Sequence, residues 1–114
     1  MVDATTSVGQ LRERVRQFVH ARDWEPFHTP RELSMAISIE ASELLDLFLW
    51  RGEAGSKELR LADRSAIAEE LADVVIYGLS LANALDLDLS DAVLSKLRLD
   101  EAKYPVDRFR GRAR

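Results

Sequence analysis

Apolar residues recur every three to four positions along most of the chain, which is the spacing of helices that bury one face. Four segments show this pattern and none alternates in the manner of a strand, so we predict an all-α, four-helix bundle-like domain over residues 1–114. The four predicted helices run from Ser7 to Arg22, from Pro30 to about Trp50, from Arg64 to about Leu85 and from about Asp91 to just before Tyr104.

Two local signals mark where helices begin. The run Thr29-Pro30-Arg31-Glu32 forms a capping box with proline at the first helical position, which predicts the start of the second helix. Asp63 is a candidate N-cap for the third helix. Residues 51–61, which contain two glycines among charged residues, are predicted to form a loop.

The third predicted helix is apolar over much of its circumference. Its apolar residues include Val74, Val75, Ile76, Leu79 and Leu81, which spread beyond a single face. Three neighbouring helices in a chain of this length cover such a helix with difficulty, so we predict a homodimer or homotetramer. The alternative is a central helix that is simply well buried within one chain.

Two pairs of acidic residues stand at helical spacing. Glu40 and Glu43 share one side of the second helix, and Glu70 and Asp73 share one side of the third. Glu40 lies within an apolar stripe, where an ionised carboxylate is costly unless it is paired or bound to a cation. A single such pair is usually a solvated face, but two pairs facing apolar stripes on successive helices predict a divalent-metal site.

The residue types at this site restrict the metal. The chain has no cysteine and lacks the Glu-x-x-His motifs of di-iron bundles, and neither His20 nor His28 is placed to supply one. Ligation by carboxylates alone favours Mg²⁺, with Mn²⁺ as a substitute, over Zn²⁺ or iron. Because Mg²⁺ in such sites is completed by water and substrate phosphates, the pattern points to phosphate chemistry.

Composition narrows the remaining classes. With 46% hydrophobic and 32% charged residues the chain is globular, and no apolar run is long enough to cross a membrane, so we expect a cytoplasmic protein. The net charge of −4 makes nucleic acid an unlikely partner. Residues 108–114 carry four arginines, which we interpret as a flexible, solvated basic tail; the alternative is a phosphate or RNA contact.

Several blocks in a fixed order resemble the all-α, MazG-like nucleoside triphosphate pyrophosphatases, and within them the dCTP pyrophosphatase branch. The resemblance extends from about Leu11 to Val106. Its elements are RDW at 22–24, FHTP at 27–30 with Leu33, EASEL at 40–44 followed by Phe48 and Trp50, EELADVVIY at 69–77, Asp88-Leu89, Ala92-Val93, Lys96, and KYP at 103–105.

The resemblance implies Mg²⁺-dependent hydrolysis of a (deoxy)nucleoside triphosphate to the monophosphate and pyrophosphate, in the service of nucleotide pool cleansing. By position, the metal ligands would be Glu40, Glu43, Glu70 and Asp73. Water would attack the α-phosphorus, with Glu43 as the first candidate for orienting or deprotonating it and Glu40 beside it.

The resemblance also implies a nucleotide-binding set. Lys96 and Lys103 would neutralise phosphates, with Arg108 or Arg110 as further contributors, although their spacing alone is that of a solvated face. The base would lie against aromatic residues, which otherwise serve as core or interface anchors. The substrate-binding candidates are Trp24, His28, Trp50, Tyr77, Lys96, Asp100, Lys103 and Tyr104.

The chain departs from the family pattern in two respects. Ile39, Ala41 and Ser42 stand around the first glutamates, where glycine is usual, and Asp100 stands where asparagine is common. Because an ionised aspartate only accepts hydrogen bonds, base and sugar preference could differ here.

Three functions are therefore open. The preferred one is hydrolysis of dCTP or a modified pyrimidine deoxynucleotide. The second is the same chemistry on another nucleotide, such as dUTP or a phosphoribosyl-nucleotide. The third is a non-catalytic helical interaction module, which the four intact acids disfavour.

Overall fold

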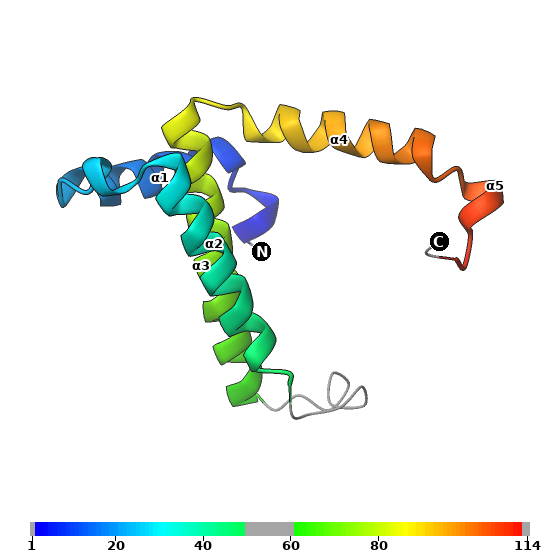
Figure 1. The fold of residues 1–114 in the computed structure, drawn as a ribbon, viewed down its shortest axis with the longest axis horizontal. Helices are drawn as coiled ribbons and strands as arrows, with labels where there is room; N and C mark the ends of the chain where they lie inside the picture. Colours follow the sequence, from blue (N-terminus) through cyan, green and yellow to red (C-terminus); the bar gives the residue numbers. More distant parts are fainter. Residues whose placement is uncertain (1, 50–60, 113–114) are drawn as a thin grey trace.

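The computed structural model describes residues 2–49 and 61–112, and every regular element in these ranges is helical. This confirms the all-α class. The elements are η1 (Val2–Ala4), α1 (Val8–Ala21), η2 (Glu25–Phe27), α2 (Pro30–Asp46), α3 (Leu61–Leu85), α4 (Leu89–Lys103) and α5 (Val106–Phe109) (Figure 1).

The first two helices begin at capping residues. The Ser7 hydroxyl accepts a hydrogen bond from the Gln10 amide at 3.1 Å, and the Gln10 side chain accepts one from the Ser7 amide at 2.7 Å. The hydroxyl of Thr29 accepts from the Glu32 amide at 3.2 Å, with Pro30 at the first helical position. Both starts lie where the sequence predicts them, because caps are set by neighbouring residues.

Three predicted boundaries are wrong. The second helix ends at Asp46 and not near residue 50, since the chain tightens into turns in which the Phe48 amide bonds the Leu45 carbonyl at 2.9 Å. The third begins at Leu61, so Asp63 lies in its first turn and is not its N-cap. The fourth begins two residues early because Asp88 caps it, accepting from the Asp91 amide at 2.8 Å.

The packed part of the chain consists of α1, α2 and α3. Figure 1 shows α2 and α3 running side by side in opposite directions, with α1 across the upper part of α3. Leu33 on α2 is only 1% exposed, and Val19, Leu79 and Ala82 are also buried. Asn83 ties α1 to α3, because its Oδ1 accepts from the Arg12 Nε at 3.0 Å and its Nδ2 donates to the Arg12 carbonyl at 3.0 Å.

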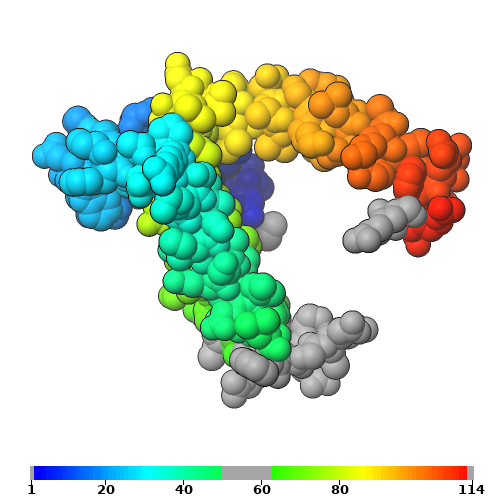
Figure 2. Space-filling model, in the orientation of Figure 1, coloured from blue at the N-terminus to red at the C-terminus, as the bar shows by residue number. Residues whose placement is uncertain are grey.

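The fourth helix does not complete a bundle within one chain. With α5 it forms an arm that extends away from the α2–α3 pair (Figures 1 and 2). Large apolar side chains stay exposed on both parts, among them Leu71, Val75, Ile76, Val93, Leu94 and Leu97. The predicted homo-oligomer remains a prediction, and these faces are where a second copy would pack. Among the described helices, none has the length and apolar character needed to cross a membrane.

The basic segment begins as ordered structure. Arg108 and Phe109 belong to α5, and the Phe109 ring meets the Tyr104 ring edge-on with centroids 5.2 Å apart. The predicted flexible tail over 108–114 therefore starts inside a helix, and its flexibility remains a prediction.

Candidate functional site

The acidic residues of α2 and α3 converge where the two helices run antiparallel. One carboxylate oxygen from each of Glu40, Glu43 and Glu70 lies within 4.8 Å of the other two. Glu40 and Glu43 are one turn apart on α2, and Glu70 faces them from α3. The structure thus brings three of the four predicted metal ligands together.

The cluster is partly withdrawn from solvent. Glu40 and Glu70 are half-buried, whereas Glu43 is exposed at the rim. The Oε2 atoms of Glu40 and Glu70 are buried and accept no hydrogen bond from any described residue. Buried carboxylate oxygens are normally satisfied, so these two oxygens are open positions for a cation or a proton.

Burial and neighbouring negative charges raise the pKa of two acids in the cluster. Partial burial raises the pKa of Glu40, and a hydrogen bond and the negative charge of Glu43 raise it further. Burial likewise raises the pKa of Glu70, followed by the charges of Glu43 and Asp73. Asp73 is outside the tight group of three, but it is close enough for its charge to raise the pKa of both glutamates. Its role as a ligand stays a prediction.

These residues fit a divalent cation. A cation placed among the three carboxylates would satisfy both orphaned oxygens and remove the mutual repulsion that raises the pKa values. All the donors are carboxylate oxygens, which suits a hard cation of the Mg²⁺ type.

An aromatic pocket lies one helical turn from the acids. The His28 ring lies between those of Trp24 and Tyr77, with centroid separations of 6.3 and 6.5 Å. These rings line a cavity of about 300 Å³ together with Phe27, Glu32, Leu33 and Ala36. Ala36 precedes Glu40 by four residues and Tyr77 follows Asp73 by four, so pocket and acids share one side of the α2–α3 pair.

Phe18 and Arg22 pack against Trp24 outside the pocket lining. The sequence analysis did not assign them this role. The Phe18 ring meets Trp24 edge-on at 5.7 Å, and the Arg22 guanidinium lies 3.7 Å from the Phe18 ring centroid. The available signal was the i, i+4 spacing of Phe18 and Arg22 next to Trp24.

The basic candidates lie elsewhere. Lys96 and Asp100 are on α4, and Lys103 and Tyr104 are at its end, on the arm that extends away from the acids (Figure 1). The Lys96 Nζ donates to the Asp100 Oδ1 at 2.8 Å, and this contact raises the pKa of Lys96. One chain therefore does not bring these residues to the acidic cluster. Trp50 lies outside the described residues.

Comparison with known proteins supplies a family. The chain is similar to dCTP pyrophosphatase 1 of Rattus norvegicus, with 41% identity over 105 residues, which is 90% of this chain and 62% of that protein. The human dCTP pyrophosphatase 1 is 41% identical over 106 residues, which is 91% of this chain and 62% of that protein. This chain thus spans about three fifths of the length of these relatives.

A solved structure shares the fold. A pyrophosphatase from Archaeoglobus fulgidus DSM 4304 superposes with a TM-score of 0.79 at 37% identity, over 85% of this chain and 91% of that one. The family model for the MazG-like family matches residues 35–114, which include all four acids and the whole of α4. The chain belongs to the MazG-like family, as the match to the family model, the shared fold and the acid pairs on antiparallel helices together show.

Proposed function

We propose that this protein hydrolyses a nucleoside triphosphate to the monophosphate and pyrophosphate. The observation that carries the proposal is the group of Glu40, Glu43 and Glu70 carboxylates within 4.8 Å of one another. Two buried oxygens of this group have no hydrogen-bond partner among the residues that the structure describes. The names of the similar proteins, dCTP pyrophosphatase 1 and a pyrophosphatase, agree with this reaction.

Glu40, Glu43 and Glu70 would hold a divalent cation, with Asp73 as a fourth ligand, and Mg²⁺ is the first candidate. When bound, Mg²⁺ offsets the charge of the triphosphate and of the departing pyrophosphate and makes a nearby water more acidic. Mn²⁺ has the same preference for oxygen donors and would substitute for it.

The side chains of the cluster differ in the work they can do. Glu40 and Glu70 are half-buried and are suited to a fixed ligand role. Glu43 is exposed beside them and can accept the proton of an attacking water. The water oxygen then bonds to the α-phosphorus while the bond from the α-phosphorus to the bridging oxygen breaks. Pyrophosphate leaves with that oxygen, and Glu43 returns its proton to solvent.

We propose dCTP, or a modified pyrimidine deoxynucleotide, as the substrate. The base would enter the pocket of Trp24, His28 and Tyr77, one turn from the acids, and the triphosphate would extend from there toward Glu40 and Glu70. A pocket of about 300 Å³ suits one base better than a larger group.

The positively charged side chains that contact the triphosphate would come from another copy of the chain. Lys96 and Lys103 are on the arm, and α4 exposes Leu94 and Leu97, each at least half exposed. We propose a homodimer or homotetramer in which the arm of one copy lies over the α2–α3 pair of the next. We also propose a cytoplasmic location, which agrees with hydrolysis of nucleotides in the cellular pool.

A pyrophosphate-release screen over canonical and modified (d)NTPs with Mg²⁺ tests the proposal. We expect release from dCTP or a modified pyrimidine deoxynucleotide, and loss of release in Glu40→Gln and Glu70→Gln. The matched control is Glu69→Gln, which should keep full release because Glu69 is exposed next to Glu70 on α3. Release from dUTP alone would keep the chemistry and change the base. Binding of Mg²⁺ without release from any nucleotide would show a non-catalytic module and overturn the proposal.

A further inference from the structure

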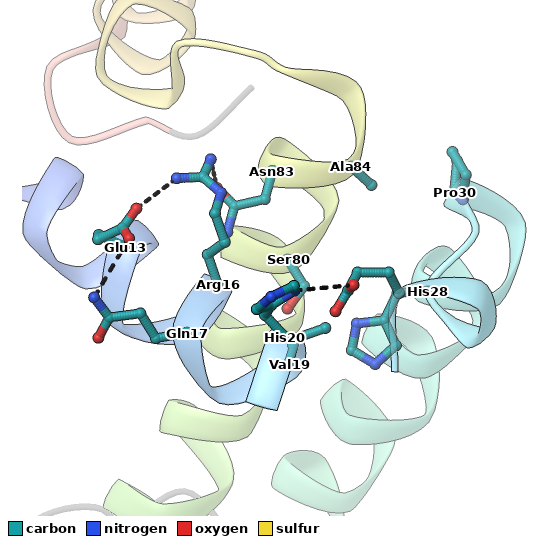
Figure 3. A pocket seen from close by; sticks show the side chains of 11 residues that line it. Glu13, Arg16, Gln17, Val19, His20, His28, Pro30, Ser80, Asn83 and Ala84 are labelled. Carbon is teal, nitrogen blue, oxygen red and sulfur yellow. Dashed lines mark hydrogen bonds and ion pairs between the residues drawn. The ribbon is translucent and has the colours of Figure 1, made fainter. Parts of the chain in front are cut away.

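A second and larger cavity lies outside the candidate nucleotide site. It has a volume of about 650 Å³ and lies between α1, η2, the first residue of α2 and the C-terminal third of α3 (Figure 3). None of the four acids lines it, and His28 is the one residue that it shares with the aromatic pocket. Its size is within the range of sites for small organic molecules.

Ser80 lines this cavity and has a buried, unsatisfied hydroxyl. The residue is 5% exposed, and its Oγ is buried without a hydrogen-bond partner among the described residues. A helical serine commonly returns its hydroxyl to a carbonyl one turn earlier, but Ser80 instead lines the cavity from α3 (Figure 3). A buried hydroxyl that is free to donate and accept is a position for a ligand group.

The charged groups around the cavity already have partners. Arg16 bonds Glu13 at 2.7 Å and the Asn83 Oδ1 at 3.1 Å, and His20 lies 3.3 Å from Glu25. These contacts are drawn in Figure 3. Among the described residues that line the cavity, Arg16 is the one arginine and Glu13 offsets its charge, so none of them offers a free arginine or lysine to a phosphate. Its occupant should therefore be uncharged.

The rest of the wall favours a flat ring. The imidazoles of His20 and His28 line it with the apolar side chains of Val19, Pro30 and Ala84. We propose that this cavity binds an uncharged planar heterocycle, a free nucleobase or an unphosphorylated nucleoside, with its polar edge hydrogen-bonded to Ser80. Because His28 also lies against Trp24 and Tyr77, the occupant contacts a side chain of the aromatic pocket.

Calorimetric titration of the full chain with cytosine, deoxycytidine, thymidine and adenosine tests this, and it needs no enzymatic activity. We expect saturable binding of at least one of them with a Kd of about 1 mM or tighter. Ser80→Ala should weaken that binding about tenfold, which corresponds to one lost hydrogen bond. It should also raise the Tm of the free protein, because it removes an unpaired buried hydroxyl. A lowered Tm would show that Ser80 has a structural bond, and would overturn the proposal.

Two alanine-to-phenylalanine substitutions show which of the two cavities binds the ligand. Ala84→Phe fills the large cavity from an exposed position, and Ala36→Phe fills the aromatic pocket. Loss of binding in Ala84→Phe, with binding kept in Ala36→Phe and pyrophosphate release unchanged in Ala84→Phe, supports the proposal. Binding kept in Ala84→Phe and lost in Ala36→Phe would place the ligand in the aromatic pocket. A change of oligomeric state in Ala84→Phe would make the cavity an interface between copies. Absence of saturable binding in the wild type would leave the cavity without a ligand. Each of these three results overturns the proposal.

Discussion

Glu40 on α2 and Glu70 on α3 each bury a carboxylate oxygen that accepts no hydrogen bond from the described part of the chain, and the two helices pack antiparallel. Their partial burial and the charges of Glu43 and Asp73 raise the pKa of both side chains. Without a cation, this arrangement destabilises the folded chain. The cluster therefore links stability, proton binding and metal binding, and each link can be measured.

Adding Mg²⁺ to metal-free protein should raise its Tm, because a cation that binds only the folded state stabilises it by about 2.7 kcal/mol at a hundred times its Kd. Glu40→Gln and Glu70→Gln should remove this shift and abolish pyrophosphate release while leaving helicity unchanged. Differential scanning calorimetry and circular dichroism give the readouts, and Glu69→Gln is the control. Full release in excess EDTA, or in either variant, would refute the metal assignment.

The metal-free protein should lose stability as the pH rises. In the folded state the pKa values of Glu40 and Glu70 lie above the ordinary value of 4.5, so between that value and the raised ones the folded state binds more protons than the unfolded state. Stability then falls with increasing pH across this window and levels off above it. Urea unfolding at a series of pH values measures this. The Glu40→Gln/Glu70→Gln double variant should show a flatter profile, and an equally steep one would contradict the prediction.

Saturating Mg²⁺ should reverse the sign of this dependence. A bound cation holds the carboxylates ionised and lowers their pKa below the unfolded value, so stability is lost as the pH falls. The same urea series with and without Mg²⁺ would show the two slopes, and the wild-type slope staying negative in saturating Mg²⁺ would count against binding at these residues.

The sequence predicts those features of the structure that depend on residues close together in the chain. The start at Thr29-Pro30 is correct because a cap depends on residues within one turn. The convergence of Glu40, Glu43 and Glu70 follows from the i, i+3 spacing of Glu40 and Glu43 on α2 and from the antiparallel packing of α2 and α3. The early end of α2 at Asp46 has no such signal, since Leu47 and Phe48 continue the apolar pattern.

Features that depend on distant surfaces were not predictable. The apolar pattern of α4 shows that Leu94 and Leu97 need a partner, but not whether that partner belongs to the same chain. The i, i+4 spacing of Lys96 and Asp100 is that of an ion pair on one helix face, whereas the family resemblance implies a contact between Lys96 and the nucleotide. The unsatisfied hydroxyl of Ser80 gives no sequence signal, because it depends on what α1 places opposite it.

If the arm serves a second copy, an inactive variant and an impaired variant should complement each other. Glu40→Gln retains the lysines and Lys96→Ala retains the acids, so a mixed dimer contains one complete site. Random reassortment should restore about one quarter of wild-type pyrophosphate release in a symmetric dimer. Light scattering should show a dimer or tetramer for each variant. No recovery after mixing and refolding, or an active monomer, would refute the shared site.

Trp24 should contribute to binding of the base. Its ring lines the pocket beside His28, so Trp24→Ala should raise KM by roughly tenfold to a hundredfold, given about 1–3 kcal/mol for one stacked base. The value of kcat should change less, because the acids are untouched. Phe109→Ala, which removes an aromatic ring on the arm, is the control. An unchanged KM in Trp24→Ala would place the base elsewhere.

Asp100 should act on the phosphates through Lys96 and not on the choice of base. Its carboxylate accepts a hydrogen bond from the Lys96 Nζ at 2.8 Å. This contact holds the pKa of the Lys96 ammonium group above its ordinary value. In Asp100→Asn the lysine loses a negative neighbour and becomes freer to pair with phosphate. Stability should change little, because solvent screens an exposed i, i+4 ion pair.

The expected kinetic result of Asp100→Asn is a change in kcat/KM by the same factor for dCTP, dTTP, dUTP and CTP. Triphosphate is common to all four, whereas the base and the sugar differ. Lys96→Ala should lower all four values together and make Asp100→Asn without further effect in the double variant, since the aspartate then has no lysine to influence. A changed ranking among the four nucleotides in Asp100→Asn would instead place this carboxylate against the base or sugar, as the departure of Asp100 from the family pattern first suggested.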